Sequence, residues 1–176
     1  MSEIIILPAA IEDRDNMADL FLSHISQHTE YISHGEIQMG VGEGIMQDGS
    51  FVTYPSPNAR EMWLKYITAH IEDGGNNAKV LKAVEKGEDG ERLAGFCVVD
   101  IEEDGADPFG MVCDVLVDER FRGRGVGGTL LERGIAWLRE QGIKDIYLES
   151  GMHNHSAHDF FRRRGFVHVS EIFKLA

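Results

Sequence analysis

The sequence contains little cysteine, little proline and no long apolar run. Of its 176 residues only 2 are cysteine and 4 are proline. The cysteines, Cys97 and Cys113, both lie inside apolar stretches, which argues against a disulfide framework or a cysteine-based zinc site and favours a reducing cytoplasm. No window approaches the ~18 consecutive apolar residues of a transmembrane helix, and the start of the chain lacks the basic region of a signal peptide. We therefore expect neither a membrane partner nor a targeting segment.

Basic residues are also scarce. The chain has 17 Lys and Arg against 30 Asp and Glu, a net charge of −13. Because a general binder of nucleic-acid phosphates carries the opposite sign, we expect no nucleic-acid partner. Residues 1–118 hold 7 basic and 23 acidic side chains, whereas residues 119–176 hold 10 and 7. This asymmetry suggests two ligands of opposite charge; an acidic surface that only keeps the protein soluble is the alternative.

The length and the 43% hydrophobic content predict a single domain over residues 1–176. Hydrophobic periodicity predicts helices and strands in the order β-αα-βββ-α-β-α-β, which is an α/β (α+β) fold with a mixed, mostly antiparallel sheet and flanking helices. Residues 29–58 lack a clear period and are expected to form a functional loop or to contain a missed element. The expected strands are 4–7, 78–86, 91–102, 110–117, 143–149 and 166–174, and the expected helices are 11–28, 59–72, 126–141 and about 155–164.

A glycine- and arginine-rich segment, VDERFRGRGVGGTLL at 117–131, joins an expected strand to an expected helix. Glycines let backbone N–H groups turn toward a ligand. The following helix adds unpaired N–H donors and a partial positive charge. The segment therefore predicts a site for a phosphate or pyrophosphate.

Two common phosphate motifs fit this segment poorly. A Walker loop would need Gly-Lys-Ser/Thr at a fixed spacing, which is missing here. Residues 123–128 match G-x-G-x-x-G, and Glu149 follows 21 residues later, as in a dinucleotide site. Charged residues crowd the bend, however, and an antiparallel meander precedes it, so a dinucleotide-binding protein is only a weak alternative.

Two motifs resemble the GNAT superfamily of acyl-CoA N-acyltransferases. RGRGVG at 122–127 fits R-x-x-G-x-G/A, and NHSAHDFFRRRGF at 154–166 resembles a second family segment, N-x-x-A-x-x-F/L-Y-x-x-x-G-F. The resemblance covers roughly residues 78–170. It implies a GNAT-like domain that uses acetyl-CoA to acetylate an amine.

The resemblance also implies where the coenzyme lies. Loop amides would hold the pyrophosphate, nearby basic side chains the 3′-phosphate, and the 110–117 strand the pantetheine arm. The implied coenzyme-binding residues are Val115, Val117, Arg120, Arg122, Gly123, Arg124, Gly125, Val126, Gly127, Gly128, Thr129, Asn154 and Phe161.

Catalysis needs a group that orients the amine or accepts its proton. Asp114 interrupts an apolar strand just before the glycine loop and is our candidate. Phe161 stands where the family commonly has a Tyr that can donate a proton; Ser150, His153, His155 and His158 are alternative donors. His24 and His28 have i, i+4 spacing but lack further ligands, so no metal site is predicted.

The acceptor is expected to be a small cationic primary amine, because the 29–58 region is acidic. Tyr31, His34, Glu36 and Tyr54 are the candidate acceptor residues. Acetyl transfer would be direct, through a ternary complex. The alternative is a non-catalytic module that binds or senses acyl-CoA, and the resemblance also allows a homodimer.

Overall fold

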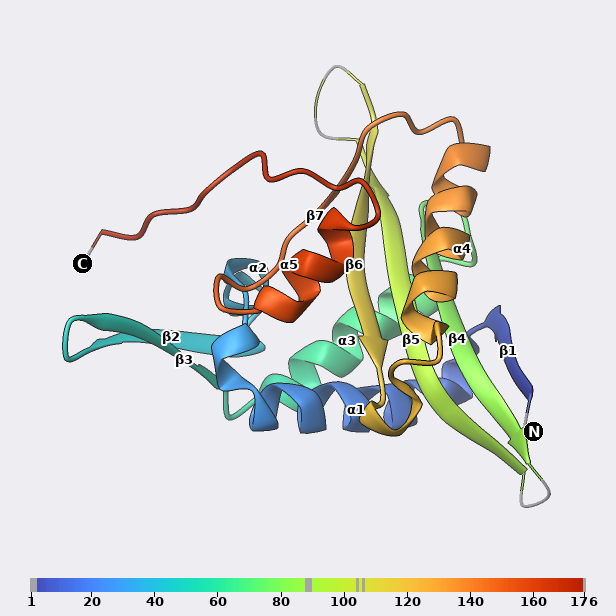
Figure 1. Ribbon diagram of the computed structural model, residues 1–176, viewed down its shortest axis with the longest axis horizontal. Coiled ribbons are helices and arrows are strands. Elements are labelled where there is room, and N and C mark those ends of the chain that lie inside the picture. The colour runs from blue at the N-terminus through green and yellow to red at the C-terminus, as the bar shows by residue number, and fades with distance from the viewer. Residues whose placement is uncertain (1–2, 88–89, 104, 106, 176) are drawn as a thin grey trace. The chain divides into compact units, whose positions relative to one another are not determined.

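The computed structural model describes residues 3–87, 90–103, 105 and 107–175. The chain divides into two compact units (Figure 1). The first consists of Met1–Phe21 and Leu64–Leu148, and the second of Leu22–Trp63 and Glu149–Ala176. The single domain expected for residues 1–176 stays a prediction. Within the part of the chain that the structure describes, no helix combines the length and apolar character needed to cross a membrane.

A five-stranded sheet forms the centre of the first unit. Its spatial order is β1-β4-β5-β6-β7, and every neighbouring pair is antiparallel except β6 and β7, which are parallel. This arrangement confirms the mixed, mostly antiparallel sheet and the meander of its three middle strands. The strand bounds are β1 Glu3–Pro8, β4 Ala78–Gly87, β5 Gly90–Glu102, β6 Phe109–Val117 and β7 Ile146–Leu148.

A β-bulge interrupts the pairing of β5 with β6. Val98 pairs with Asp114 but Val99 pairs with Val112, so Cys113 is an extra residue in β6. Side chains of a regular strand alternate between faces, and a bulge breaks that alternation. As a result Cys113 and the next residue, Asp114, both lie near the helix α3, Ala59–Glu72.

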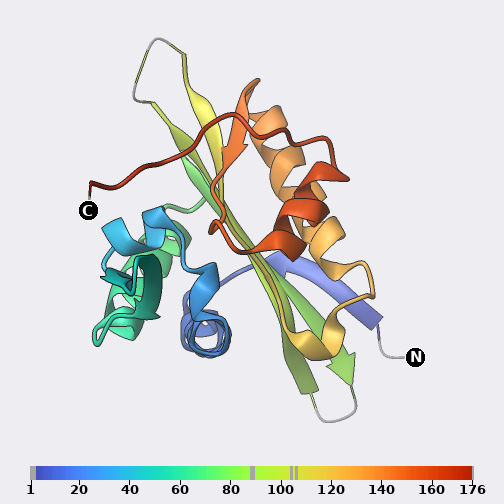
Figure 2. The ribbon, with the colours of Figure 1, turned by 60° about the vertical axis from the view of Figure 1, so that its left-hand side comes forward.

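Helices cover both faces of the sheet (Figure 2). On one face lies α4, Val126–Glu140, whose Gly134 is so close to β5 that an added Cβ would stand 2.9 Å from Val99 Cγ1. On the other face, His70 of α3 contacts Asp100 of β5. A 3-10 turn at Ile11–Asp13 leads into α1, Arg14–Gln27, and Asp13 pairs with Lys82 of β4 at 2.7 Å.

The second unit contains a hairpin and helices that the sequence pattern missed. Residues 29–58 include a 3-10 turn, Thr29–Tyr31, the helix α2, His34–Gln38, and the paired strands β2, Gly42–Gln47, and β3, Ser50–Pro55. Gly44 obscured the strand pattern, yet packing demands it, since an added Cβ would lie 2.2 Å from Phe51 Cζ. Asp48 and Gly49 both have positive φ, 49° and 79°, as the tight hairpin requires.

The strand expected at 166–174 is wrong. The helix α5, His155–Arg162, is present, but residues 166–175 have no regular structure. Alternating apolar residues favour an extended chain, but a strand also needs a neighbouring strand for its backbone hydrogen bonds. None of the described strands pairs with this segment. Its apolar side chains are exposed, namely Val167, Val169, Ile172, Phe173 and Leu175.

Candidate functional site

The segment that follows β6 folds back on itself before α4 begins. The Asp118 carboxylate accepts a hydrogen bond from Arg120 N at 2.9 Å and starts a 3-10 turn, Glu119–Phe121. Gly123 and Gly125 then take φ angles of 74° and 81°. Side-chain-bearing residues rarely adopt such angles, so these glycines allow the reversal that directs the chain into α4.

The beginning of α4 is not capped by a side chain. Gly125 occupies the N-cap position, and the described residues give this end no side-chain cap. Thr129 N bonds to Gly125 O at 3.1 Å, whereas the amides before it precede the first intrahelical bond. An added Cβ on Gly125 would meet nothing within 4 Å. Open space, first-turn N–H groups and the helix dipole together fit a phosphate group.

The arginines of the loop are already engaged. Arg120 pairs with Asp118 at 2.7 Å, and this bond lowers the pKa of the Asp118 carboxyl. Arg124 pairs with Glu85 at 3.2 Å, and Arg122 Nε donates to Val117 O at 3.1 Å. An anion at this site would compete for Arg120 and Arg124, which leaves the backbone amides as its primary ligands.

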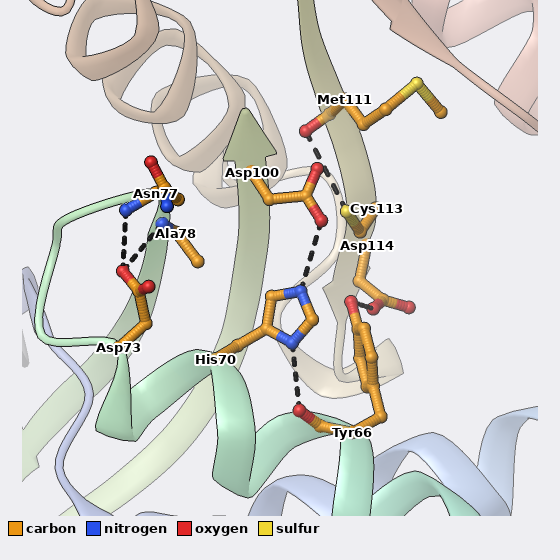
Figure 3. A network of polar contacts seen from close by, with 9 residues as sticks. All are labelled: Tyr66, His70, Asp73, Asn77, Ala78, Asp100, Met111, Cys113 and Asp114. Carbon is orange, nitrogen blue, oxygen red and sulfur yellow. Dashed lines mark hydrogen bonds and ion pairs between the residues drawn. The ribbon is translucent and has the colours of Figure 1, made fainter. Parts of the chain in front are cut away.

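Asp114 lies beside the bulge and has a partly buried neighbour that can donate to it. Tyr66 Oη of α3 donates to Asp114 Oδ2 at 2.7 Å (Figure 3). Burial, together with the negative charge of Asp114, raises the pKa of Tyr66 well above its ordinary value. The Tyr66 hydroxyl therefore stays protonated and fixes the orientation of the carboxylate.

The edge of β6 beyond the bulge is open on its β7 side. Parallel pairing joins β6 residues 110–112 to Ile146–Leu148, and within the described residues the ladder goes no further. Val115 and Val117 follow the bulge on β6, at the end that leads into the glycine loop. Main-chain groups here can bind an extended chain in the manner of an added strand.

In the second unit, two carboxylates meet the backbone of α2. Glu36 Oε2 accepts from Ser33 N at 2.6 Å, and Glu149 Oε1 accepts from Gly35 N at 2.7 Å. Burial raises the pKa of Glu36, the bonds from Ser33 oppose this, and the charge of Glu149 raises it further. The two carboxylates give this unit a local negative charge that suits a cationic ligand.

The other candidate acceptor residues lie on nearby parts of the same unit. Tyr31 stacks on His28 with ring centroids 4.7 Å apart. Tyr54 Oη, in β3, donates to Gln47 Oε1 at 3.1 Å and its residue is 44% exposed. His34 is the first residue of α2. No bond between these three side chains is present among the described residues, so their shared role as acceptor ligands stays a prediction.

The residues from the second family segment have local structural roles. Asn154 caps α5, because its Oδ1 accepts from Ala157 N at 3.2 Å. The ring of Phe161 contacts those of Phe160 and Phe166, with centroids 5.3 and 5.8 Å away. Both residues belong to the second unit, whereas Asp114, the β6 edge and the glycine loop belong to the first.

Sequence reasoning missed Tyr66. It was assigned only to the apolar stripe of the 59–72 helix. A tyrosine on a buried stripe needs a partner for its hydroxyl, and Asp114 was already recognised as a carboxylate in an apolar strand. Combining these two observations would have suggested the pair.

A glycine turn that leads into a helix end without a side-chain cap is typical of α/β proteins that bind phosphate-bearing ligands. Residues 46–166 match the model of the acetyltransferase (GNAT) family, and the chain belongs to that family. The resemblance noted in the two sequence motifs is thereby confirmed.

Curated relatives match only part of the chain. An uncharacterised N-acetyltransferase of Methanocaldococcus jannaschii is 36% identical over 53 residues, which is 30% of this chain and 24% of that protein. Mycothiol acetyltransferase of Propionibacterium freudenreichii is 36% identical over 80 residues, or 44% of this chain and 25% of that protein. The matches thus span about a quarter of the length of these relatives.

Solved structures match almost the whole chain. An aminoglycoside N-acetyltransferase, AAC(6')-Iy, in complex with CoA has a TM-score of 0.68 at 13% identity, with 100% of this chain and 95% of that chain covered. At this identity the similarity shows the fold, and it does not extend to the acceptor.

Proposed function

We propose that this protein is an acetyl-CoA-dependent N-acetyltransferase that acts on a primary amine of a small cationic acceptor through a ternary complex. The observation that carries the proposal is the uncapped α4 N-terminus after the glycine turn, directly following the open edge of β6. Free cysteines agree with an expected cytoplasmic location. A homodimer remains an expectation from the family resemblance.

The coenzyme would lie along the first unit. Amides from Arg122 to Gly128 would bind the pyrophosphate, and Thr129 Oγ1, now bonded to Gly125 O at 3.2 Å, would stay at the helix end. Val115 and Val117 would offer main-chain groups to the pantetheine arm. When bound, acetyl-CoA would supply the thioester: the acetyl carbon would bond to the amine nitrogen, its bond to sulfur would break, and CoA would leave as a thiolate that takes up a proton.

Asp114 would hold the amine and take its proton, directly or through one water. Tyr66 would keep the carboxylate in place by its hydrogen bond. The acidic second unit, with Glu36 and Glu149, would attract the cationic acceptor. The structure named as an aminoglycoside N-acetyltransferase shares the fold, whereas the acceptor class is proposed here from the acidic residues of this chain.

A thiol-release assay with acetyl-CoA and a panel of polyamines, aminoglycosides and amino acids tests the proposal. We expect turnover with at least one cationic amine, and a loss of about a hundredfold or more in kcat for Asp114→Asn, the usual size of an acid–base contribution. Coenzyme affinity should be unchanged in this variant. Glu91→Gln, a half-exposed carboxylate paired with Lys86 at 3.6 Å, is the matched control.

A non-catalytic acyl-CoA module is the second candidate, and Phe161 favours it. The family resemblance places a proton donor at this position, and a phenylalanine ring has none. Coenzyme binding without thiol release for every amine tested would establish the module instead of the enzyme.

A further inference from the structure

Three potential metal ligands from three elements converge in the first unit. They are His70 of α3, Asp100 of β5 and the bulged Cys113 of β6 (Figure 3). A ring nitrogen, a carboxylate oxygen and the Sγ atom of these residues all lie within 4.8 Å of one another. The side chains of His70 and Asp100 are only 17% and 18% exposed.

The hydrogen bonds of His70 leave a nitrogen lone pair directed at a second acceptor. Nδ1 lies 2.9 Å from Tyr66 O. A carbonyl oxygen only accepts, so Nδ1 carries the hydrogen and the neutral ring has a bare Nε2. This Nε2 lies 3.2 Å from Asp100 Oδ2, which also only accepts when ionised. Two acceptor atoms this close repel each other unless a proton or a metal ion lies between them.

Among the described residues, one oxygen of the cluster lacks a hydrogen-bond partner, and the thiol, a weak donor, has only weak contacts. Asp100 Oδ1 is buried, and no donor among the described residues bonds to it. Cys113 Sγ lies 3.9 Å from Met111 O and also interacts with the side chains of Asp100 and Tyr66. Burial, followed by the charge of Asp100, raises the pKa of the Cys113 thiol. An unsatisfied buried carboxylate oxygen costs stability unless something binds it.

We propose that His70, Asp100 and Cys113 form a Zn²⁺ site with three protein ligands and one open position. Imidazole, carboxylate and thiolate are the ligand types that zinc prefers, and three protein ligands leave the fourth position for water. Zinc bond lengths of about 2.0–2.3 Å put tetrahedral ligand atoms about 3.3–3.8 Å apart. His70 Nε2 and Asp100 Oδ2, 3.2 Å apart, are already near this spacing, and the three ligand atoms lie within 4.8 Å of one another. The Tyr66 carbonyl would orient the imidazole as an outer-shell partner.

An ion pair between protonated His70 and Asp100 is the competing interpretation. It accounts for the 3.2 Å contact but leaves the buried Asp100 Oδ1 without a partner among the described residues. The zinc site uses all three groups. It would also tie α3 to β5 and β6, so binding should stabilise the fold.

Titration of the chelator-treated full chain with Co²⁺, a spectroscopic substitute for Zn²⁺, tests the site. We expect one Co²⁺ per chain with a near-ultraviolet thiolate charge-transfer band, which Zn²⁺ displaces. Zn²⁺ should also raise the melting temperature and protect Cys113 from alkylation. Because the readouts are optical and thermal, the result does not depend on the acetyltransferase proposal.

Variants connect the signal to the cluster. Cys113→Ser should abolish the band, and Asp100→Asn and His70→Gln should each weaken Co²⁺ binding at least tenfold, with folding checked by circular dichroism. Cys97→Ala removes the other free cysteine and should leave the band unchanged. Absence of a thiolate band in the folded wild-type protein, or a band that persists in Cys113→Ser, would overturn the proposal.

Discussion

Tyr66 and Asp114 form the contact on which the proposed chemistry depends. The tyrosine is partly buried and remains protonated, so its hydroxyl donates to the carboxylate instead of accepting a proton. Tyr66 is therefore a positioning residue that acts through Asp114. By binding Oδ2, it fixes the orientation of the carboxylate and so the position of its other oxygen, Oδ1.

Tyr66→Phe should lower kcat about tenfold, because a hydrogen bond to a charged group contributes about 1.5–3 kcal/mol. Substrate affinity should change little. In the Asp114→Asn background the same substitution should have almost no further effect, since the two side chains act as one unit. Steady-state kinetics of the double-mutant cycle measures this.

Tyr147→Phe is the control, because this tyrosine is 43% exposed on β7 and lies outside the proposed machinery. Additive losses for Tyr66→Phe and Asp114→Asn would show that Tyr66 acts independently of the carboxylate.

Glu36 shows how a residue that we propose for acceptor binding can reduce stability. Its folded pKa is raised, chiefly by burial, above the unfolded value of 4.5. A carboxyl with a raised folded pKa destabilises the fold when ionised, at pH above the folded value. That cost disappears as the pH falls below the unfolded value.

Glu36→Gln should therefore raise the melting temperature at about pH 7, and the difference should vanish below about pH 4. The glutamine oxygen can still accept from Ser33 N, so α2 keeps its capping bond. Thermal unfolding across pH measures the effect. Glu43→Gln, at an exposed position in the same unit, should leave the curve unchanged; equal shifts for both variants would contradict the burial argument.

Among the elements, the glycine turn before α4 was predictable and the β-bulge was not. The turn depends on residues within it, Gly123 and Gly125, and it precedes an amphipathic helix. The bulge at Cys113 depends on the register of β6 against β5, which is set by distant residues. The convergence of Cys113 and Asp114 on α3 was therefore inaccessible from the sequence.

The hairpin and the C-terminal segment show the same difference between features set by nearby residues and features set by distant ones. Asp48-Gly49 is a standard hairpin signal, but Gly42 and Gly44 interrupt the apolar alternation of β2, the strand before it. The 166–174 segment has the alternation of a strand, yet pairing is not a property of the segment alone. The helix expected at 59–72 was correct, because hydrophobic periodicity is a local property of the sequence.

Two glycines at opposite ends of α4 provide a matched test of the glycine turn, residues 122–128, that we propose binds the coenzyme. Gly125 and Gly142 have φ angles of 81° and 82°, and an added Cβ would meet nothing within 4 Å at either position. Glutamate at either site should cost a similar ~1–2 kcal/mol of stability, because L-residues disfavour this conformation.

Only Gly125→Glu should weaken acetyl-CoA binding, by at least tenfold, since it places a carboxylate beside the phosphate-binding amides. Calorimetric stability and coenzyme affinity of the two variants measure the difference. Equal affinity in Gly125→Glu and Gly142→Glu would remove the loop from the coenzyme site.

At the scale of the whole molecule, the distribution of charge agrees with the two binding sites that we propose, one for the coenzyme and one for the acceptor. The net charge of −13 hides a basic stretch, residues 119–176, and an acidic one, residues 1–118. The coenzyme loop lies in the basic stretch, and Glu36 in the acidic one. Composition alone suggested two ligands of opposite charge, while the family match gives the class of the anionic ligand.

Binding of acetyl-CoA to the purified, folded chain tests the central claim most directly. Isothermal titration calorimetry should give a saturable heat with one coenzyme per chain, weaker at high salt because the phosphates contribute. A flat titration with acetyl-CoA and with free CoA, from protein shown to be folded by circular dichroism, would contradict the account.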